Sequence, residues 1–448
     1  MVEAGPGPDD PRVGTQLSDG LRLPIGVASS VVRRFHTTLT DHPVRRAQIM
    51  RGAVVGGSGA VNGGYFCRAL PTDIEAWDLD GWRWADVLAH FKAIENDLDF
   101  PGEPHGSAGP ITVRRVAEFD GCTASFVAAC EDAGFERLVD LNGATPGHPI
   151  PPGVGAVPLN IERGTRVGPG GAFLQPASGR PNLALHTDTH AQQILLRDGR
   201  AVGVGCVGPD GPVTLTADRI VVSAGAIASA HLLMLSGIGP AEMLRSAGVR
   251  AGADLPVGVG TVDHPEWVLP VNWSPTHGVP PLEAVLITDS GLEIRPYTAG
   301  FGAMMTGRRD DPTDRPHLGV TLMRPQSRGR IALVSPDPQV PPLIEHRYDS
   351  ALADVELLRD GTRLAHELAG ATAEPQSFWA TSQHLCGSAR MGRDGDGSAV
   401  VDARCRVLGL DGLWVVDGSI LPSIPSRGPH ATIVMAAHRA AEFVSAGL

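Results

Sequence analysis

Asp218-Arg219-Ile220-Val221-Val222-Ser223-Ala224-Gly225 is the stretch that indicates the fold class most plainly. Its unbroken apolar centre predicts a short strand that is buried on both faces, as strands of parallel sheets are. The chain turns at Ala224-Gly225 and continues into an apolar segment, which predicts a helix from about Ala228 to Leu235. A strand, a turn and a helix in this order are typical of an α/β protein.

A second buried strand is predicted near the end of the chain. Leu413-Trp414-Val415-Val416-Asp417 is apolar up to its acidic last residue, and Asp417-Gly418 closes it as a turn. A final helix is predicted from about Ala431 to Ala446, and an amphipathic helix over Asp354–Leu368. From about residue 270 to about residue 345, predicted short strands alternate with Pro and Gly residues, which indicates a separate strand-rich region.

The N-terminal half begins with a run that looks like the end of a strand, Met1 to Pro6, with the acidic Glu3 inside it. A Gly-, Pro- and polar-rich stretch follows to about residue 45, and we expect it to be irregular. A Gly-dense loop then runs from Arg51 to Gly64. Glycines let a backbone approach a ligand closely, although a surface turn would show the same composition.

Further elements are predicted between these landmarks. Apolar residues at a helical spacing predict a helix over Ala85–Asn96. Asn182–Leu196 and Ala201–Val207 are β-rich runs, and Asp198-Gly199 between them is a hairpin signal. The three tryptophans at positions 77, 82 and 84 are expected to pack in the core.

The composition excludes several classes of function. The net charge of −12 offers no basic surface for nucleic acid. The longest apolar runs, such as Ile220–Ser229, are too short to cross a bilayer. The histidines show no metal-binding spacing, so no metal site is expected. The cysteines are scattered and form no CxxC pair, which favours free thiols in a reducing cytoplasm. They are Cys67, Cys122, Cys130, Cys206, Cys386 and Cys405.

Five separated segments resemble the glucose–methanol–choline (GMC) oxidoreductases, in the order in which that family carries them. They are Val2–Pro6; Gly56–Asn62; Gly225–Ser229 with Leu235–Gly239; Leu255–His264; and His384–Gly392 with Val416–Ser419 and Pro429–Thr432. The resemblance implies an α/β fold, with a Rossmann-like FAD-binding domain interleaved with an α+β substrate-binding domain built on an antiparallel sheet. The FAD-binding domain would comprise residues 1–118, 159–269 and 382–448, and the substrate-binding domain residues 119–158 and 270–381.

The same resemblance implies which residues hold FAD. Glu3 would accept hydrogen bonds from the ribose hydroxyls, as an acidic residue does at that place in such folds. The other implied cofactor-binding residues are Gly56, Gly57, Ser58, Asn62, Gly63, Ala191, Ala224, Gly225, Asp417, Gly418, Ala431 and Thr432. Asn62 would bond the flavin or substrate, or simply cap its turn. Some family members link FAD covalently to a His just before this Asn; here Val61 fills the place, which implies non-covalent FAD.

His384 occupies the family's position for the base that takes the hydroxyl proton of an alcohol, although a lone His near a strand end is often structural. A neutral imidazole with a pKa near neutrality suits this task. The family places a second His or Asn eleven residues after the Asp that matches Asp417, which is Gly428 here. His430 lies two residues further, and we expect it to take the second catalytic role unless the pair is modified. Cys386 has no nucleophile motif around it and is expected to be a bystander.

Within the family, Gly57–Arg68 and Ser426–Thr432 resemble the GMC dehydrogenase of the mycofactocin system. This implies that the alcohol is reduced mycofactocin, a peptide-derived redox cofactor, and that electrons pass to a respiratory acceptor. The expected location is the cytoplasm, in solution or peripherally at the inner face of the membrane.

One family feature has no match. FAD-binding folds of this kind open with a strand and G-x-G-x-x-G, roughly 25–30 residues before the acidic residue, and Glu3 is almost the first residue here. We therefore expect that the sequence starts after this loop. Three alternatives stay open: another GMC alcohol oxidase or dehydrogenase, a family member that cleaves cyanohydrins, and an inactive, FAD-poor binding protein.

Overall fold

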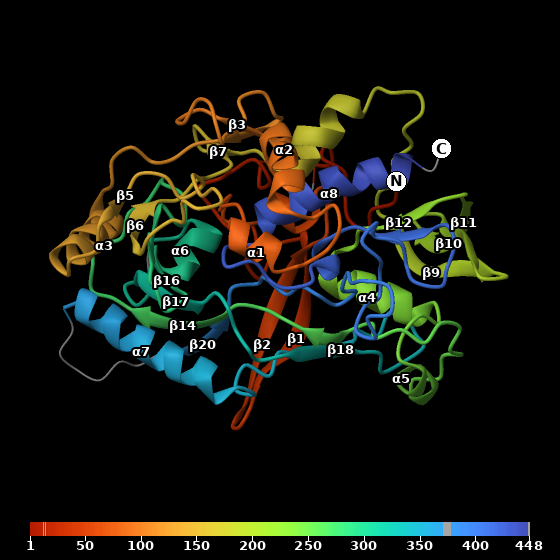
Figure 1. Cartoon of the computed structure of the whole chain (residues 1–448). Helices are drawn as coiled ribbons and strands as arrows, with labels where there is room; N and C mark the ends of the chain where they lie inside the picture. The colour runs from red at the N-terminus through yellow and green to blue at the C-terminus, as the bar shows by residue number, and fades with distance from the viewer. Residues whose placement is uncertain (12, 14, 310, 371–377, 447–448) are drawn as a thin grey trace.

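The computed structural model describes residues 1–11, 13, 15–309, 311–370 and 378–446. They form a mixed α/β molecule with a five-stranded and a seven-stranded sheet, several smaller sheets, and helices packed around them (Figure 1). The predicted fold class, an α/β protein with an antiparallel sheet, is confirmed. Among the described residues, no helix combines the length and the apolar character that crossing a bilayer requires.

The α-helices of this part of the chain are α1 (Pro71–Glu75), α2 (Trp84–Ile94), α3 (Gly121–Asp132), α4 (Gly225–Leu235), α5 (Ala241–Ser246), α6 (Phe301–Thr306), α7 (Leu352–Leu368) and α8 (His430–Ser445). Short helical turns are η1 (Gly57–Ala60), η2 (Gly170–Leu174), η3 (Gln175–Ala177) and η4 (Gly418–Ile420). Two short strand pairs are β3 (Glu95–Asp97) with β4 (Ile111–Val113), and β7 (Ile161–Glu162) with β8 (Thr165–Arg166).

The predicted strand–turn–helix unit is present. β12 (Ile220–Val222) pairs in parallel with β21 (Leu413–Val415), so the two strands predicted from apolar runs at distant positions are neighbours. The helix after β12 begins at Gly225, three residues earlier than predicted. α4 is buried on nearly its whole circumference, because β9, β18 and η4 all contact it, and a helix that is apolar all round requires such cover.

The predicted hairpin at Asp198-Gly199 is also present, in a three-stranded sheet of β9 (His190–Arg197), β10 (Arg200–Gly208) and β11 (Gly211–Thr216). Both turn residues have positive φ, as a type I′ turn requires. The prediction that the first strand starts at Asn182 is wrong. The chain before His190 pairs instead with the N-terminal segment, through a parallel bridge between Val2 and His186.

The prediction of an irregular stretch up to residue 45 is wrong as well. β1 (Val32–Asp41) and β2 (Val44–Gly52) form a long antiparallel hairpin there (Figure 1). It belongs to the five-stranded sheet β13–β18–β19–β1–β2, whose other strands are β13 (Val259–Thr261), β18 (Gly329–Ala332) and β19 (Leu343–Glu345). Paired arginines and threonines hide the period-2 pattern in the sequence, since β2 buries few of its side chains.

The seven-stranded sheet has the order β20–β14–β17–β16–β15–β6–β5. Its strands are β20 (Phe378–Thr381), β14 (Pro265–Pro270), β17 (His317–Leu322), β16 (Leu292–Tyr297), β15 (Ala284–Ile287), β6 (Gly153–Ala156) and β5 (Arg137–Leu138). Apolar residues of α3 and α7 pack against it and form a second core. α7 starts two residues before the predicted helix and ends at the predicted residue.

The domain boundaries stay a prediction. β14 lies before the proposed boundary at residue 269, yet it pairs inside the seven-stranded sheet, between β20 and β17. A boundary just before Pro265 therefore follows the sheet better. The tryptophans at positions 77, 82 and 84 are buried in the main core beside α2 and α8, as predicted.

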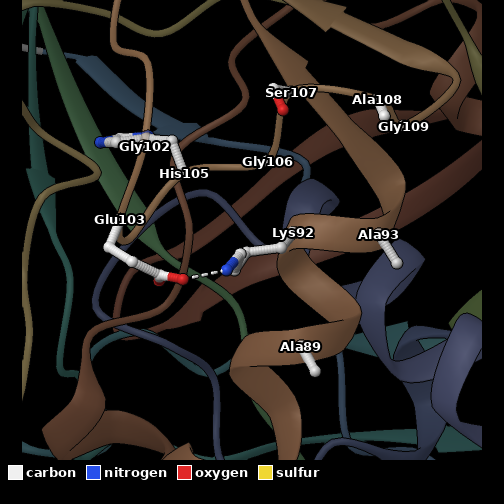
Figure 2. A pocket seen from close by; sticks show the side chains of 10 residues that line it. All are labelled: Ala89, Lys92, Ala93, Gly102, Glu103, His105, Gly106, Ser107, Ala108 and Gly109. Atoms are coloured by element: carbon white, nitrogen blue, oxygen red, sulfur yellow. Dashed lines mark hydrogen bonds and ion pairs between the residues drawn. The ribbon is translucent and has the colours of Figure 1, made fainter.

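A surface hollow of about 460 Å³ lies between α2 and the segment 102–109 (Figure 2). Lys92 and Glu103 form an ion pair across it, and His105 is part of its wall. On its inner side, His105 contacts buried, charged side chains.

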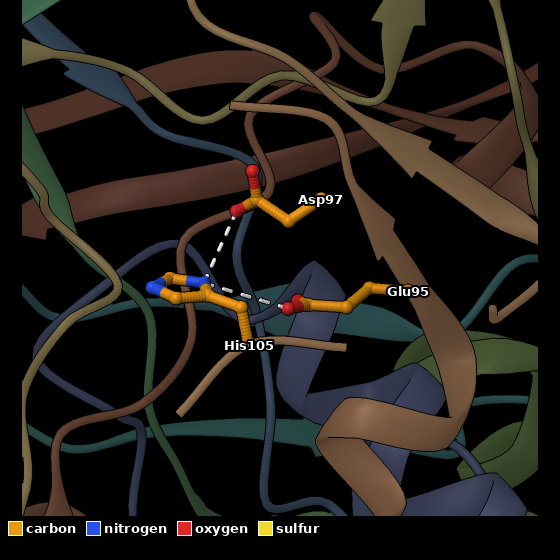
Figure 3. A group of neighbouring side chains, drawn as sticks. All are labelled: Glu95, Asp97 and His105. Atoms are coloured by element: carbon orange, nitrogen blue, oxygen red, sulfur yellow. Dashed lines mark ion pairs between the residues drawn. The ribbon is translucent and has the colours of Figure 1, made fainter. Parts of the chain in front are cut away.

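His105 lies within ion-pair distance of two carboxylates of β3, Glu95 and Asp97 (Figure 3). Its Nε2 is also 2.9 Å from Asp140. A histidine beside two carboxylates resembles a metal site, but Arg68 pairs with Glu95, and Arg115 pairs with Asp97 and Asp140. The two arginines and His105 thus balance the three carboxylates of this cluster.

The electrostatics of this cluster follow from its neighbours. Burial lowers the pKa of His105, but hydrogen bonds to Asp140, Asp97 and Glu95 outweigh it and raise that pKa to about 10. Burial likewise opposes ionisation of Asp97, but His105 and Arg115 lower its pKa to about 2. His105 is therefore an imidazolium at neutral pH, held between ionised carboxylates.

We expect His105→Leu to lower the free energy of unfolding at neutral pH by roughly 3 kcal/mol, because buried carboxylates lose a cation that they share. The folded pKa of His105 lies above its usual value, so its stabilisation is complete below about pH 6.5 and is lost as the pH rises through about 10. Urea unfolding at about pH 6 and about pH 10, followed by Trp fluorescence, measures both effects. His148→Leu, at an exposed position, is the control. An equal loss in both variants would contradict this account.

Candidate active site

The rings of His384 and His264 meet where two neighbouring strands of the seven-stranded sheet come together. β14 begins directly after His264, and β20 ends three residues before His384. Because β14 and β20 are antiparallel, with Pro265 opposite Thr381, both histidines lie at the same end of this pair of strands. Their Nδ1 atoms are 2.9 Å apart, and the ring planes are nearly perpendicular.

The carboxylate of Asp263 holds this pair of histidines in place. Its Oδ1 accepts hydrogen bonds from the backbone N–H groups of His264 and His384, both at 2.8 Å. Its Oδ2 accepts from the hydroxyls of Tyr348, at 2.8 Å, and Thr381, at 2.6 Å. One buried carboxylate thus ties β14, β20, the segment after β19 and the chain around His384 together.

The surroundings keep the imidazole of His384 neutral. Burial of the ring lowers its pKa well below the usual value, and the nearby rings and guanidinium groups act in the same direction. These neighbours are His264, Arg295, Arg51 and His430. Burial alone lowers the pKa of His430 to about 4. Two unprotonated imidazoles are therefore available at neutral pH, which is the state a general base needs.

His430 joins this site to the Gly-dense loop. It is the first residue of α8, and its ring contacts Phe66 edge-on, with the centroids 5.6 Å apart. A β-carbon built on Gly59 would lie 2.8 Å from Cε1 of His430, so the loop backbone passes directly beside the ring. The Nε2 of His430 is buried and has no hydrogen-bond partner among the described residues, so it is free to meet a ligand.

Gly428 fills the space between Tyr65 and His384. A β-carbon on Gly428 would lie 2.8 Å from the Tyr65 ring and 3.6 Å from Cε1 of His384. The predicted catalytic residues His384 and His430 and the predicted loop are thus brought together by the fold. The role of Gly428 as a spacer was not predicted.

The Gly-dense loop turns on left-handed glycines. Gly56 and Gly57 have φ of 96° and 54°, which favour glycine. The Ser58 hydroxyl accepts from the N–H of Gly52, and Oδ1 of Asn62 accepts from the N–H of Gly64. Of the two roles considered for Asn62, its side-chain oxygen therefore performs the turn-capping one. Gly57 faces open space, so a ligand can approach its backbone.

A segment that the sequence did not single out covers this loop. A β-carbon on Gly168 would lie 2.9 Å from the Gly59 carbonyl oxygen, and one on Gly170 would lie 3.0 Å from that of Val55. Only glycines permit such close backbone packing. The repeated glycines in Val167-Gly168-Pro169-Gly170-Gly171 were the available signal.

The N-terminal segment reaches the start of the same loop. The Pro6 carbonyl accepts from the N–H of Val55, and Gly5 is pressed against the backbone of Ala53. Glu3 pairs through its backbone with His186 and Thr189, and its carboxylate accepts from the N–H of Gly5 at 2.9 Å. Desolvation by burial raises the pKa of this carboxyl.

Asp417 and the turn after β12 form a second predicted group that the fold brings together. Oδ2 of Asp417 accepts from the N–H of Gly225, at 2.9 Å, and from the hydroxyl of Ser229, at 2.5 Å. Its Oδ1 accepts from the N–H and hydroxyl of Ser419. The side chain of Asp417 is thus used to join the carboxyl ends of β12 and β21. Gly225, with φ of 82°, faces open space as Gly57 does.

Two other predicted residues have structural partners. The Thr432 hydroxyl accepts from the N–H of Ala69 at 3.1 Å, which fixes the first turn of α8 against the chain after the loop. Ala431 beside it is buried. Ala191 lies in β9 opposite Cys206 and packs against the main core.

Charged side chains on the seven-stranded sheet form a wall near His384, which no pattern in the sequence predicted. Glu293 accepts from Tyr65 at 2.8 Å and pairs with Arg295 and, at 3.6 Å, with Arg427. A neighbouring carboxylate, Glu266, accepts from the hydroxyls of Tyr297 and Ser382 and lies 3.8 Å from Arg295. Two guanidinium groups thus balance two carboxylates. They come from β14, β16 and the segment before α8, so only tertiary pairing could reveal them.

Cys386 lies beside the histidines as a buried thiol. Burial raises its pKa well above the usual value, and its Sγ lies 3.0 Å from the carbonyl oxygen of His384. A thiol held in this form is a poor nucleophile, which favours the prediction that Cys386 is a bystander.

The residues present fit a bound FAD. Gly57 and Gly225 expose backbone to open space, and the buried Nε2 of His430 lacks a partner. The N-terminus of α8 carries a partial positive charge that suits the anionic edge of a reduced flavin. Glu3 lies in a partly buried place with acceptor oxygens for hydroxyl groups.

Comparison with known proteins gives a consistent picture. Two family profiles described as GMC oxidoreductase match residues 26–266 and 325–437. An uncharacterised GMC-type oxidoreductase from the thcA 5′ region of Rhodococcus erythropolis is 42% identical over 95% of this chain and 88% of its own length. The oxygen-dependent choline dehydrogenase of Rhizobium etli (strain CIAT 652) is 30% identical over 99% and 90%. The crystal structure of pyridoxine 4-oxidase from Mesorbium loti superposes with a TM-score of 0.87 at 26% identity, covering 99% of this chain and 94% of that one.

We expect Asp263→Ala to lower the free energy of unfolding by about 3 kcal/mol or more, because several donors, two of them backbone N–H groups, lose their acceptor in the interior. Asp263→Asn keeps one acceptor oxygen and should lower the free energy of unfolding less than Asp263→Ala does. Chemical denaturation of each variant checks the order. Asp210→Ala, in the exposed turn between β10 and β11, is the control and should match the unaltered protein. Equal stability of the two Asp263 variants would count against the hydrogen-bond account.

Proposed function

Because the chain belongs to the GMC oxidoreductase family, whose members are FAD-dependent oxidoreductases acting on CH–OH groups, we propose that it oxidises an alcohol with FAD as hydride acceptor and His384 as base. The observation that carries this proposal is the position of the His384 ring, which contacts His264 and lies close to His430 and the Gly-dense loop, where burial lowers its pKa. Bound FAD supplies an acceptor for the hydride at its N5 atom.

The residues of the chain supply proton transfer and orientation. His384 takes the proton of the substrate hydroxyl, which prepares the carbon to lose a hydride. The carboxylate of Asp263 holds the backbone of His384 while the ring takes the proton, and Arg295 of the charged wall is close enough to act on that ring. His430 offers its unpartnered Nε2 as a hydrogen-bonding group for substrate or product.

The family resemblance supplies the residues that would hold FAD. Glu3 would accept from the ribose hydroxyls, while backbone groups at Gly56–Gly57, at Ala224–Gly225 and at Asp417–Gly418 would meet the rest of the cofactor. Ser58, Asn62 and Gly63 would complete the loop. Ala431 and Thr432 would bring the positive end of α8 to the flavin, and Ala191 would contribute from β9.

For the substrate we propose reduced mycofactocin, with electrons passing to a respiratory acceptor at the cytoplasmic side of the membrane. The support is that the two stretches with this finer resemblance, Gly57–Arg68 and Ser426–Thr432, meet at one place. Tyr65 from the first and Arg427 from the second both approach Glu293, at 2.8 Å and 3.6 Å. The two stretches that carry the finer resemblance thus both reach the proposed substrate wall.

We expect the flavin absorbance of the FAD-loaded protein to bleach anaerobically with its alcohol, and His384→Asn to slow this reduction by about 10²- to 10⁴-fold. A panel of alcohols that includes reduced mycofactocin and choline identifies the substrate, and stopped-flow absorbance gives the rate constant. His430→Asn should give a smaller loss.

Retained FAD in the His384→Asn protein is the control, because the variant must fail in chemistry and not in cofactor binding. Bleaching at the unaltered rate in that variant would overturn the assignment of the base. Peroxide formation with oxygen as the sole acceptor separates an oxidase from a dehydrogenase.

We expect FAD to be released when the protein is precipitated with acid, because the proposal has non-covalent cofactor. Val61, a buried residue of the loop, has no side-chain atom that could form a covalent bond to the flavin. Absorbance of the supernatant and the pellet measures the partition. Yellow colour that stays with the pellet would contradict the proposal.

A further inference from the structure

The two imidazoles of His264 and His384 face each other through the same atom, Nδ1, at 2.9 Å. Burial is the main influence that lowers the pKa of both rings, to about 4 for His264, so both are neutral at neutral pH. A neutral imidazole has one N–H and one bare nitrogen. This contact is therefore a hydrogen bond only if one ring donates its Nδ1 proton and the other accepts it.

The role proposed for His384 decides which ring donates. The side chain of His264 is completely buried, and its Nε2 has no hydrogen-bond partner in the described part of the chain. Because Nδ1 of His384 is taken up by the contact with His264, Nε2 is the nitrogen of His384 that is left to accept the hydroxyl proton of a substrate. A neutral imidazole carries a single N–H, so Nδ1 of His384 carries it and donates to the bare Nδ1 of His264.

The opposite arrangement does not suit a base. With the proton on Nδ1 of His264, His384 would accept through its own Nδ1 and carry its hydrogen on Nε2, the atom that has to be bare. Two bare Nδ1 atoms facing each other would leave buried polar groups unsatisfied, at a cost of about 1–3 kcal/mol. One of the two rings therefore donates, and the role of a base requires that it is His384.

We propose that His264 is a positioning residue that fixes the tautomer of His384, so that Nδ1 of His384 carries its proton and Nε2 stays bare to accept the hydroxyl proton of the substrate. This inference rests on the proposed function, in which His384 is the base. The O–H bond of the alcohol breaks and an N–H bond forms at Nε2, while the hydride leaves for FAD. His264 exchanges no proton.

The arrangement also supports the product of that proton transfer. Once His384 is an imidazolium, its Nδ1–H still donates to the bare Nδ1 of His264, and a hydrogen bond from a charged donor is roughly twice as strong as a neutral one. The charged groups that face His264 are Asp263, Glu293 and Arg295. Asp263 also fixes the backbone of both histidines, so the ring geometry is held from two sides.

The direct test is the position of the proton, read from the ¹⁵N shifts of histidine-labelled protein by two-bond ¹H–¹⁵N correlation. His384→Asn identifies the His384 signals by their loss. The unaltered protein should show Nδ1 protonated and Nε2 bare in His384. A proton on Nε2 would overturn the proposal, with or without FAD.

Variants at position 264 test the consequence. His264→Leu removes the acceptor, so the His384 proton should move between the two nitrogens, and flavin reduction should fall by about 10²-fold. His264→Asn returns an acceptor oxygen at the same distance along the side chain, and should recover most of the rate and the original tautomer. His231→Leu, another buried histidine with a lowered pKa, is the matched control and should change neither.

The outcomes separate this inference from the proposed function. If His264→Leu keeps the tautomer and rate of the unaltered protein, the role of His264 is overturned. If that variant does not fold, failure of His264→Asn to keep Nδ1 of His384 protonated would overturn it. If the expected tautomer is found and no alcohol bleaches the flavin, the proposed function fails while the proton assignment stands.

Discussion

The site depends on one buried carboxylate, that of Asp263. It accepts hydrogen bonds from two backbone N–H groups and two hydroxyls that come from separate parts of the chain. An ionised carboxylate in the interior is costly unless its oxygens are satisfied in this way. The same bonds fix the seven-stranded sheet to the segment that carries His384. The hydrogen bonds of Asp263 therefore both stabilise the contact between the sheet and this segment and hold His384 in place.

Two balanced groups of charges fix the chain that leaves the Gly-dense loop. Tyr65 is bonded to Glu293 on the wall of the seven-stranded sheet, and Arg68 is bonded to Glu95 in the cluster that contains His105. The loop is thus anchored on two opposite sides within four residues. In each group the cationic side chains face an equal number of the carboxylates described above, which lowers the cost of burying them.

The sequence allowed prediction of features that rest on local patterns. The strand before Ala224-Gly225 and the strand before Asp417 have continuous apolar runs, and the fold pairs them in parallel. His384 and His430 were found through resemblance, and the structure brings them to one place with the loop. β1 and β2 were missed because arginines and threonines interrupt their apolar residues, and because β2 buries few of its side chains. The contact between His264 and His384, 120 residues apart, depends on antiparallel pairing that no local pattern encodes.

Gly428 has a consequence for how this site can change. It stands where the resemblance led us to look for a His or Asn, and any side chain there would enter the ring of Tyr65. The ring of Tyr65 therefore fits in its present position because residue 428 has no side chain. A side chain at 428 would require the ring of Tyr65 to move, and the hydrogen bond that ties this ring to Glu293 would be strained or lost.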